Sequence, residues 1–273
     1  MKPQLRPVQA AWLAEIGLDL HWVRIQPIAA PDVVQEPIAP PAHAKAAPPA
    51  APAVRAPAPD QPAVRPRSTP APDTVPLVAP VVDDADMAAL AEVIRGCQQC
   101  ARHQQRLRAV PGSGQAERPY YLIVAEQPGI DDEVAGQPFQ GDSGRLLTAM
   151  LAAVRLPHAD ARYGTYVVKC RAPGGHEPDP AEVAACIPYL RREIALVQPH
   201  WILALGRVAA QAVLGGSADL DALRGMAHRY QPDSGPAIPV WVTHQPASLL
   251  VRSSLKAEAW RDLAGLAQTV RAE

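Results

Sequence analysis

The chain has 273 residues, of which 48% are hydrophobic and 19% charged, and its formal net charge at pH 7 is −1. This length allows one or two domains. The balanced charge argues against a broad basic face that grips nucleic acid, and no apolar stretch is long enough to span a membrane. The N-terminus lacks the apolar segment and cleavage site of a signal peptide, so we expect a reducing, cytoplasmic location.

Proline is distributed unevenly along the chain. Of the 32 prolines, 18 precede residue 84, and residues 27–83 consist mostly of proline and alanine. Such a segment cannot bury a core, so we expect it to be an extended, disordered linker. The linker separates a short peptide, residues 1–26, from a folded domain, residues 84–273.

The N-terminal peptide differs in composition from the linker. Trp12, Leu13 and Ile16 would share one face of a short helix, and Gly17 is placed to end that helix. A peptide this short cannot form a core alone, so it would dock either on its own domain or on a partner. Tryptophans are typical anchors of protein interfaces. The residues expected to contact a partner are Trp12, Leu13, Ile16, Leu18 and Trp22.

The folded domain alternates apolar stretches with segments of helical periodicity. The apolar stretches predict strands over residues 121–125, 163–168, 201–205 and 240–243. Helices are expected from near residue 84, after residue 144, from residue 180, over residues 208–213 and over residues 254–270. This alternation predicts an α/β fold with a mostly parallel sheet.

Polar side chains follow the strand at residues 121–125. The strand ends at Glu126 and is followed by a Pro128-Gly129 turn. Open α/β sheets carry their functional side chains at this carboxyl edge. A glycine-rich loop at residues 136–144 then presents Phe139, the only phenylalanine in the chain.

The four cysteines have the spacing C-x2-C-x69-C-x15-C, at positions Cys97, Cys100, Cys170 and Cys186. Disulfides are not expected in a reducing compartment. Four thiolates could hold zinc, although a structural zinc site usually has two close pairs of ligands. A [4Fe-4S] cluster held by four distant thiolates fits at least as well.

These motifs resemble those of one known family. Residues 97–263 are similar to the family 4 (iron–sulfur) uracil-DNA glycosylases. The resemblance implies a three-layer α/β/α sandwich and a [4Fe-4S] cluster held by the four cysteines. The matching stretches, in the family's order, are Cys97–Cys100, Val110–Gly114, Glu126–Gly129, Pro138–Gly141, Val168–Arg171, Cys186, Ala204–Gly206, Arg224–Gly225, Leu255–Lys256 and Trp260–Leu263.

The resemblance also implies roles for three residues of a base pocket. A glycosylase must extrude the target base, stack it and stabilise the departing anion. In the family, a phenylalanine stacks on uracil, and Phe139 matches it. An acid of the first motif handles the water or the sugar cation, and Glu126 matches it, with Gln127 beside it in the pocket.

Two further pocket positions depart from the family pattern. Tyr166 stands where the family has an asparagine that reads the uracil edge, and a phenol cannot make the paired contacts of an amide. The tyrosine is also larger and would fill the space that a flipped base needs. Gln245 stands where the family has a histidine that stabilises the leaving base. His244 precedes it and would point to the opposite face of an extended segment, so it would serve only after a register slip or bulge.

The N-terminal peptide resembles that of the psi subunit of bacterial DNA polymerase III, which binds the chi subunit. Together with the two pocket changes, this resemblance favours a non-catalytic, psi-like accessory subunit that links chi to the clamp loader. The alternative is an active glycosylase that excises uracil or a related damaged base, with His244 as a possible participant. A third hypothesis is a relic of the fold that binds DNA without chemistry. Independently of these hypotheses, the balanced overall charge leaves room for a local basic groove formed by Arg106, Arg108, Lys169 and Arg171, although the first two could simply be surface charges.

Overall fold

The computed structural model describes residue 82 and residues 85–273. The predicted peptide at residues 1–26 therefore lies outside the described residues, as does the predicted linker at residues 27–83 apart from residue 82. In the part that is described, no helix is both long enough and apolar enough to cross a membrane.

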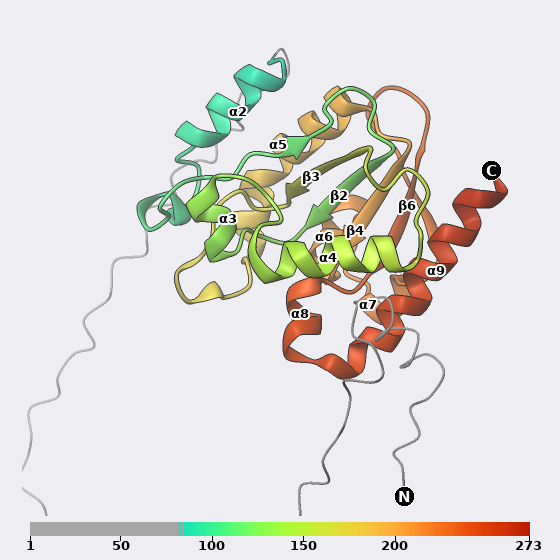
Figure 1. Ribbon diagram of the computed structural model, residues 1–273. Coiled ribbons are helices and arrows are strands. Elements are labelled where there is room, and N and C mark those ends of the chain that lie inside the picture. Colours follow the sequence, from blue (N-terminus) through green and yellow to red (C-terminus); the bar gives the residue numbers. More distant parts are fainter. Residues whose placement is uncertain (1–81, 83–84) are drawn as a thin grey trace, which may run out of the picture. The chain divides into compact units, whose positions relative to one another are not determined.

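A six-stranded sheet forms the centre of the described domain, with the strand order β1-β3-β2-β4-β6-β5 (Figure 1). The four inner strands are parallel to one another, and the two outer strands pair antiparallel. The mostly parallel sheet expected from the sequence is thereby confirmed. The strands are β1 Ser113–Gly114, β2 Tyr121–Ala125, β3 Arg162–Tyr166, β4 Trp201–Leu205, β5 Ala227–Tyr230 and β6 Ile238–Thr243.

Helices cover both faces of the sheet and give three layers (Figure 1). The helices that pack on one face are α2 Met87–Gly96, α5 Pro180–Val197 and α6 Arg207–Leu214. The helices that pack on the other face are α4 Gly141–Ala153, α8 Pro246–Val251 and α9 Lys256–Ala272. Two short helices, α3 Ile130–Ala135 and α7 Leu220–Leu223, lie in the connections.

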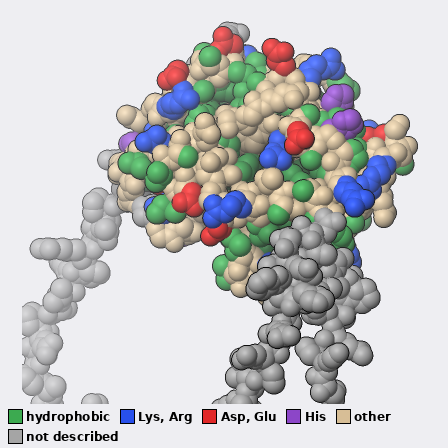
Figure 2. Space-filling model, viewed as in Figure 1, with side chains coloured by type: hydrophobic (Ala, Val, Ile, Leu, Met, Phe, Trp, Pro, Cys, Tyr) green, Lys and Arg blue, Asp and Glu red, His purple; other side chains and the backbone are tan. Residues whose placement is uncertain are grey.

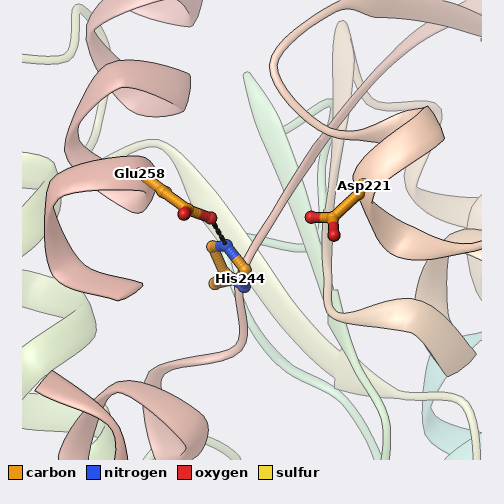
Figure 3. Close-up of side chains that lie close together, drawn as sticks. All are labelled: Asp221, His244 and Glu258. Atoms are coloured by element: carbon orange, nitrogen blue, oxygen red, sulfur yellow. Dashed lines mark hydrogen bonds and ion pairs between the residues drawn. The ribbon is translucent and has the colours of Figure 1, made fainter. Parts of the chain in front are cut away.

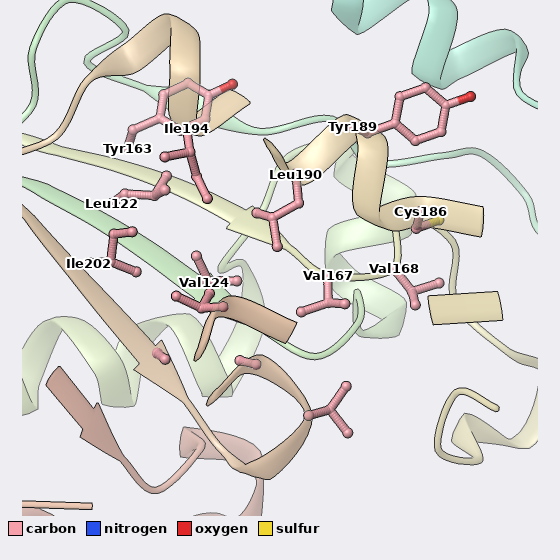
Figure 4. Packing of buried hydrophobic residues seen from close by; sticks show 14 of the residues in the cluster. Leu122, Val124, Tyr163, Val167, Val168, Cys186, Tyr189, Leu190, Ile194 and Ile202 are labelled. Carbon is pink, nitrogen blue, oxygen red and sulfur yellow. The ribbon is translucent and has the colours of Figure 1, made fainter. Parts of the chain in front are cut away.

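The two faces of β2 explain why both layers are apolar. Successive side chains of a strand point to opposite faces, so Leu122 and Val124 enter one core while Tyr121 and Ile123 enter the other. In Figure 4, Leu122 and Val124 pack with side chains of β4 and α5. A parallel strand that is buried on both faces reads as a continuous apolar run, which is the pattern of residues 121–125.

The structure departs from the sequence prediction at several strand ends. β3 ends at Tyr166 rather than at residue 168, and Val167 N–H instead donates to Ala125 O at the end of β2. β6 begins at Ile238, two residues before the predicted start. The edge strands β1 and β5 carry no apolar run, because each has a neighbour on one side only and is partly exposed.

The predicted basic groove does not form as expected. Lys169 is buried and donates to Glu193 Oε2 at 2.6 Å, to Thr165 Oγ1 at 2.7 Å and to Tyr166 O at 2.7 Å. All three protons of its ammonium group therefore have acceptors inside the fold. On the face shown in Figure 2, Lys and Arg side chains are interspersed with Asp and Glu rather than gathered in a band.

We predict that Lys169→Met destabilises the domain. The change retains much of the side-chain volume but leaves the buried Glu193 carboxylate without its cation. Removing one partner of a buried ion pair costs about 3–5 kcal/mol, which urea unfolding at neutral pH will measure. Arg145→Met is the matched control, because the Arg145–Asp142 pair is exposed and should contribute less than about 1 kcal/mol. Equal losses in the two variants would contradict the prediction.

Candidate active site

A cavity opens at the carboxyl edge of the sheet, where β2, β3 and β6 end. Its volume is about 520 Å³. Four of the residues expected in a base pocket line it together, namely Gln127, Phe139, Tyr166 and Gln245. Residues that are more than 100 positions apart in the sequence meet here because the parallel strands end at the same edge.

Phe139 and Tyr166 form one wall of this cavity. Their ring centroids lie 5.3 Å apart with an interplanar angle of 42°. The Tyr166 hydroxyl donates to Asp132 Oδ2 at 2.7 Å and accepts a hydrogen bond from the Phe139 N–H at 3.0 Å. Gly164 makes room for the phenylalanine, since a Cβ at that position would come within 2.7 Å of the Phe139 ring.

The amide group of Gln127 is occupied by contacts within the protein. Its oxygen accepts a hydrogen bond from Arg102, and its nitrogen donates to His176 O at 2.9 Å and to Glu126 Oε1 at 3.3 Å. Gln127 thus ties the end of β2 to the loop at residues 175–176. It lines the cavity, but these contacts leave little of its amide to read a base.

Glu126 is half-buried beside the cavity. Its neighbours Ala125 and Gln127 line the cavity wall, whereas Glu126 itself does not. Burial raises the pKa of the Glu126 carboxyl, and the nearby Glu177 carboxylate raises it further. Arg207 and Arg102 act in the opposite direction on the same pKa. A carboxyl group held in this way changes protonation closer to neutral pH than an exposed one does.

Gln245 presents a free amide to the cavity. It precedes α8 as the N-terminal cap residue, and its side chain makes no hydrogen bond to any residue that the structure describes. Gly206 packs against it, since a Cβ at that glycine would lie 3.2 Å from Gln245 Cβ. The amide can therefore donate to a ligand without breaking a contact of the protein.

His244 lies outside the cavity. It is buried, and its Nε2 lies 3.0 Å from Glu258 Oε2 on α9, as the dashed line in Figure 3 marks. β6 ends at Thr243, and Gln245 has an extended backbone with φ −74° and ψ 133°. The His244 side chain contacts α9 whereas Gln245 lines the cavity, as alternation along an extended segment predicts. The register slip that a catalytic role for His244 requires is not present.

Asp221, His244 and Glu258 bring possible metal-ligand atoms within 4.8 Å of one another (Figure 3). The guanidinium of Arg224, however, contacts both carboxylates, at 2.9 Å from Asp221 and 2.8 Å from Glu258. This fixed cation neutralises the acids and competes with a metal ion for them. The group is therefore an ion-pair network that joins α7 and α9 near the end of β6.

The four cysteines come from three separate segments of the described domain. Cys97 and Cys100 follow α2, Cys170 follows β3, and Cys186 lies on α5. All four are free thiols. They are near enough to influence one another: burial raises the pKa values of Cys100, Cys170 and Cys186, and neighbouring cysteine charges raise them further. The Arg106 guanidinium donates to Cys170 Sγ at 2.9 Å.

Asp132 and Arg102 have site contacts that the sequence patterns did not indicate. Asp132 accepts from the N–H groups of Gly129 and Gln140, both at 2.6 Å, as well as from Tyr166. Its place three residues after Gly129 fits a helix-capping pattern, which was the available signal. Arg102 is buried and pairs with Glu182 at 2.8 Å. Arg102 lies two residues after the Cys97–Cys100 motif, but the spacing of the cysteines does not indicate a role for this arginine.

Comparison with known proteins identifies the family. Residues 111–264 match the uracil DNA glycosylase superfamily. The chain is 36% identical over 183 residues to a Type-4 uracil-DNA glycosylase of Pyrobaculum aerophilum, covering 66% of this chain and 92% of that protein. It is 34% identical over 179 residues to a Type-4 uracil-DNA glycosylase of Archaeoglobus fulgidus, covering 63% and 88% respectively. The chain therefore belongs to the uracil DNA glycosylase superfamily, as the resemblance at residues 97–263 implied.

The hypothesis of a non-catalytic, psi-like accessory subunit is wrong. Relatives that are 32–36% identical carry the name Type-4 uracil-DNA glycosylase, which supports the alternative function, and nothing supports the chi subunit or the clamp loader as partners. The hypothesis assumed that Tyr166 would fill the space of an extruded base. In the structure, that side chain forms a wall and a cavity of about 520 Å³ remains beside it.

Proposed function

We propose that this chain is a uracil-DNA glycosylase that removes uracil, or a related damaged base, from DNA. The observation that carries the proposal is the cavity at the carboxyl edge, which is lined by both an aromatic ring, Phe139, and a free amide, Gln245. Membership of the superfamily and the names of the relatives support the same activity. The glycosylase domain would span residues 84–273, preceded by the linker at 27–83 and the peptide at 1–26.

Two residues of the cavity, together with Glu126 beside it, divide the reaction between them. The extruded base enters the cavity and stacks on Phe139. The bond between the base nitrogen and C1′ of the sugar breaks, and its electron pair leaves with the base. The Gln245 amide donates a hydrogen bond to the base oxygen on which this charge collects. Water adds to C1′ and gives up a proton, for which Glu126 is the general base, reached through one water molecule.

We further propose that Cys97, Cys100, Cys170 and Cys186 hold a [4Fe-4S] cluster. Four thiols are the ligand set that such a cluster takes, and Arg106 is placed to stabilise a thiolate at Cys170. A structural zinc site usually takes its ligands as two close pairs, whereas only Cys97 and Cys100 are close in this sequence.

When bound, the cluster would join three distant segments rather than act on the base. It would link the loop after α2 to the end of β3 and to α5. Such links stabilise the native state, because the unfolded chain does not offer the same preformed ligand set. Cysteines that bind a cluster must not be oxidised to disulfides, which agrees with the reducing cytoplasm that we expect for this protein.

We predict that the full-length protein releases uracil from a uracil-containing oligonucleotide and leaves an abasic site. Gln245→Ala should lower kcat by about 10²–10³-fold, because one donor to the leaving anion is lost. Gln245→His should retain or raise the rate, since an imidazole can donate at the same place. Phe139→Ala should weaken base stacking by about 1–3 kcal/mol. Gel analysis after strand cleavage at abasic sites measures the rate of uracil release by the wild type and by each variant.

Gln268→Ala is the matched control for this experiment, because Gln268 is an exposed residue of α9 away from the cavity. Absence of uracil release by the wild-type protein at enzyme excess would contradict the proposed function. A loss of activity in His244→Ala without a loss in Gln245→Ala would move the leaving-group role to His244. Parallel reactions on oligonucleotides with other deaminated bases define the substrate range.

We predict that the acid limb of the pH–rate profile reports Glu126. A general base must be ionised, so the rate falls as the pH drops through its raised pKa. Glu177→Gln removes a charge that raises this pKa, and it should shift the acid limb to lower pH. Glu117→Gln, an exposed change before β2, should leave the profile in place. A shift to higher pH in Glu177→Gln would rule out this electrostatic link.

We predict that protein purified without oxygen is brown and carries about four irons per chain. Cys170→Ser should lower the iron content and the melting temperature together, because the end of β3 loses its link to the other two segments. An iron assay and visible absorbance measure the cluster content, and thermal unfolding measures the melting temperature. Colourless protein with stoichiometric zinc, fully folded and active, would refute the cluster.

A further inference from the structure

The Tyr166 hydroxyl is held by two hydrogen bonds within the protein. Its side chain is buried at the end of β3, with an exposed fraction of 3%. The hydroxyl hydrogen is donated to Asp132 at 2.7 Å, and the hydroxyl oxygen accepts from the Phe139 N–H at 3.0 Å. Burial raises the pKa of the phenol, and the Asp132 carboxylate raises it further, so the hydroxyl keeps its proton.

Asp132 gathers three hydrogen bonds on a carboxylate that is 5% exposed. Its Oδ2 accepts from the Gly129 N–H at 2.6 Å and from the Tyr166 hydroxyl, and its Oδ1 accepts from the Gln140 N–H at 2.6 Å. One side chain thus joins the start of the 129–140 segment to its end. The tyrosine attaches this closed segment to the sheet.

Phe139 lies between these two anchoring points in a conformation that it would not adopt alone. Its φ of 60° is in the left-handed region, which is unfavourable for a residue other than glycine. Its carbonyl packs so closely on α4 that a Cβ at Gly144 would lie 1.7 Å from Phe139 O. Its ring rests over Gly164 of β3. Such backbone persists only where the surroundings determine it.

We propose that Tyr166 is a positioning residue, whose hydroxyl holds Phe139, directly and through Asp132, in the orientation that stacks on the extruded base. The role rests on the proposed glycosylase function. It makes Tyr166 part of the support for the stacking ring and not a reader of the base edge. The free Gln245 amide, which lines the same cavity, is then the polar side chain that meets the base.

Tyr166→Phe tests this role, because it removes the hydroxyl and keeps the ring. The Phe139 N–H loses its acceptor, and Asp132 loses one donor, so the ring is held less firmly. We expect KM for uracil-containing DNA to rise about tenfold, with a smaller change in kcat. Tyr121→Phe is the matched control, since the buried Tyr121 hydroxyl has no hydrogen-bond partner among the described residues and lies at the opposite end of β2.

A double-mutant cycle separates positioning from direct contact with the base. If Tyr166 acts through Phe139, adding Tyr166→Phe to Phe139→Ala should raise KM by less than about twofold, because no ring remains to be positioned. Fully additive effects, or a changed preference between uracil and another base in the Phe139→Ala background, would overturn the proposal. They would show that the hydroxyl meets the base itself.

Amide hydrogen exchange provides a measurement that does not depend on catalysis. In Tyr166→Phe, the N–H groups of Phe139 and Gln140 should exchange at least about tenfold faster than in the wild type and in Tyr121→Phe. Unchanged exchange at both amides would refute the proposal even in an active enzyme. Faster exchange in a protein that releases no base would retain the support of Phe139 while the glycosylase function fails.

Discussion

The parallel pairing of β2 with β3, and of β4 with β6, is the constraint on which the site depends. The pairing sets Ala125 beside Tyr166 and Leu205 beside Thr243, so the segments that leave these strands start from one edge. The backbone groups that would continue the ladder are used there as well, since the Val168 N–H donates to Glu126 O at 3.0 Å. Backbone hydrogen bonds of the sheet therefore fix the edge at which the cavity lies. Side chains such as Phe139 pack against this edge.

The inner strands of this sheet could be predicted from the sequence because they are buried on both faces. The apolar runs at residues 121–125 and 201–205 coincide with β2 and β4. β5 could not be predicted in the same way, because its sequence Ala-His-Arg-Tyr alternates between exposed and half-buried positions. Its place is decided by pairing with β6, which is a tertiary contact that no local pattern records. The same holds for the two residues of β1, which pair with β3.

The site was predictable where direction follows from backbone geometry and not where it depends on packing. Alternation along an extended segment indicated that Gln245 and His244 face opposite ways. In the structure, Gln245 lines the cavity and His244 contacts Glu258 outside it. The effect of a tyrosine at position 166 could not be derived in this way. Whether a large side chain fills a cavity or forms its wall depends on the partner of its hydroxyl. That partner, Asp132, lies on α3, a short helix that the apolar pattern did not predict. The expectation of lost activity rested partly on that unseen contact and partly on the glutamine at position 245.

The two pocket changes are easier to understand together than separately. Unlike the asparagine of the family pattern, Tyr166 cannot make the paired contacts that read a base. Its hydroxyl instead makes two hydrogen bonds, to the Phe139 N–H and to Asp132. Gln245 lines the cavity with a free donor and a free acceptor in one amide, and the proposed reaction needs a donor to the leaving base. An amide offers both at once, so under the proposed function this single side chain can meet both the edge of a base and the charge that develops on it. Recognition and leaving-group stabilisation, which two residues share in the family pattern, would then converge on position 245. The strength of base selection would depend on how rigidly Phe139 confines the base against that amide.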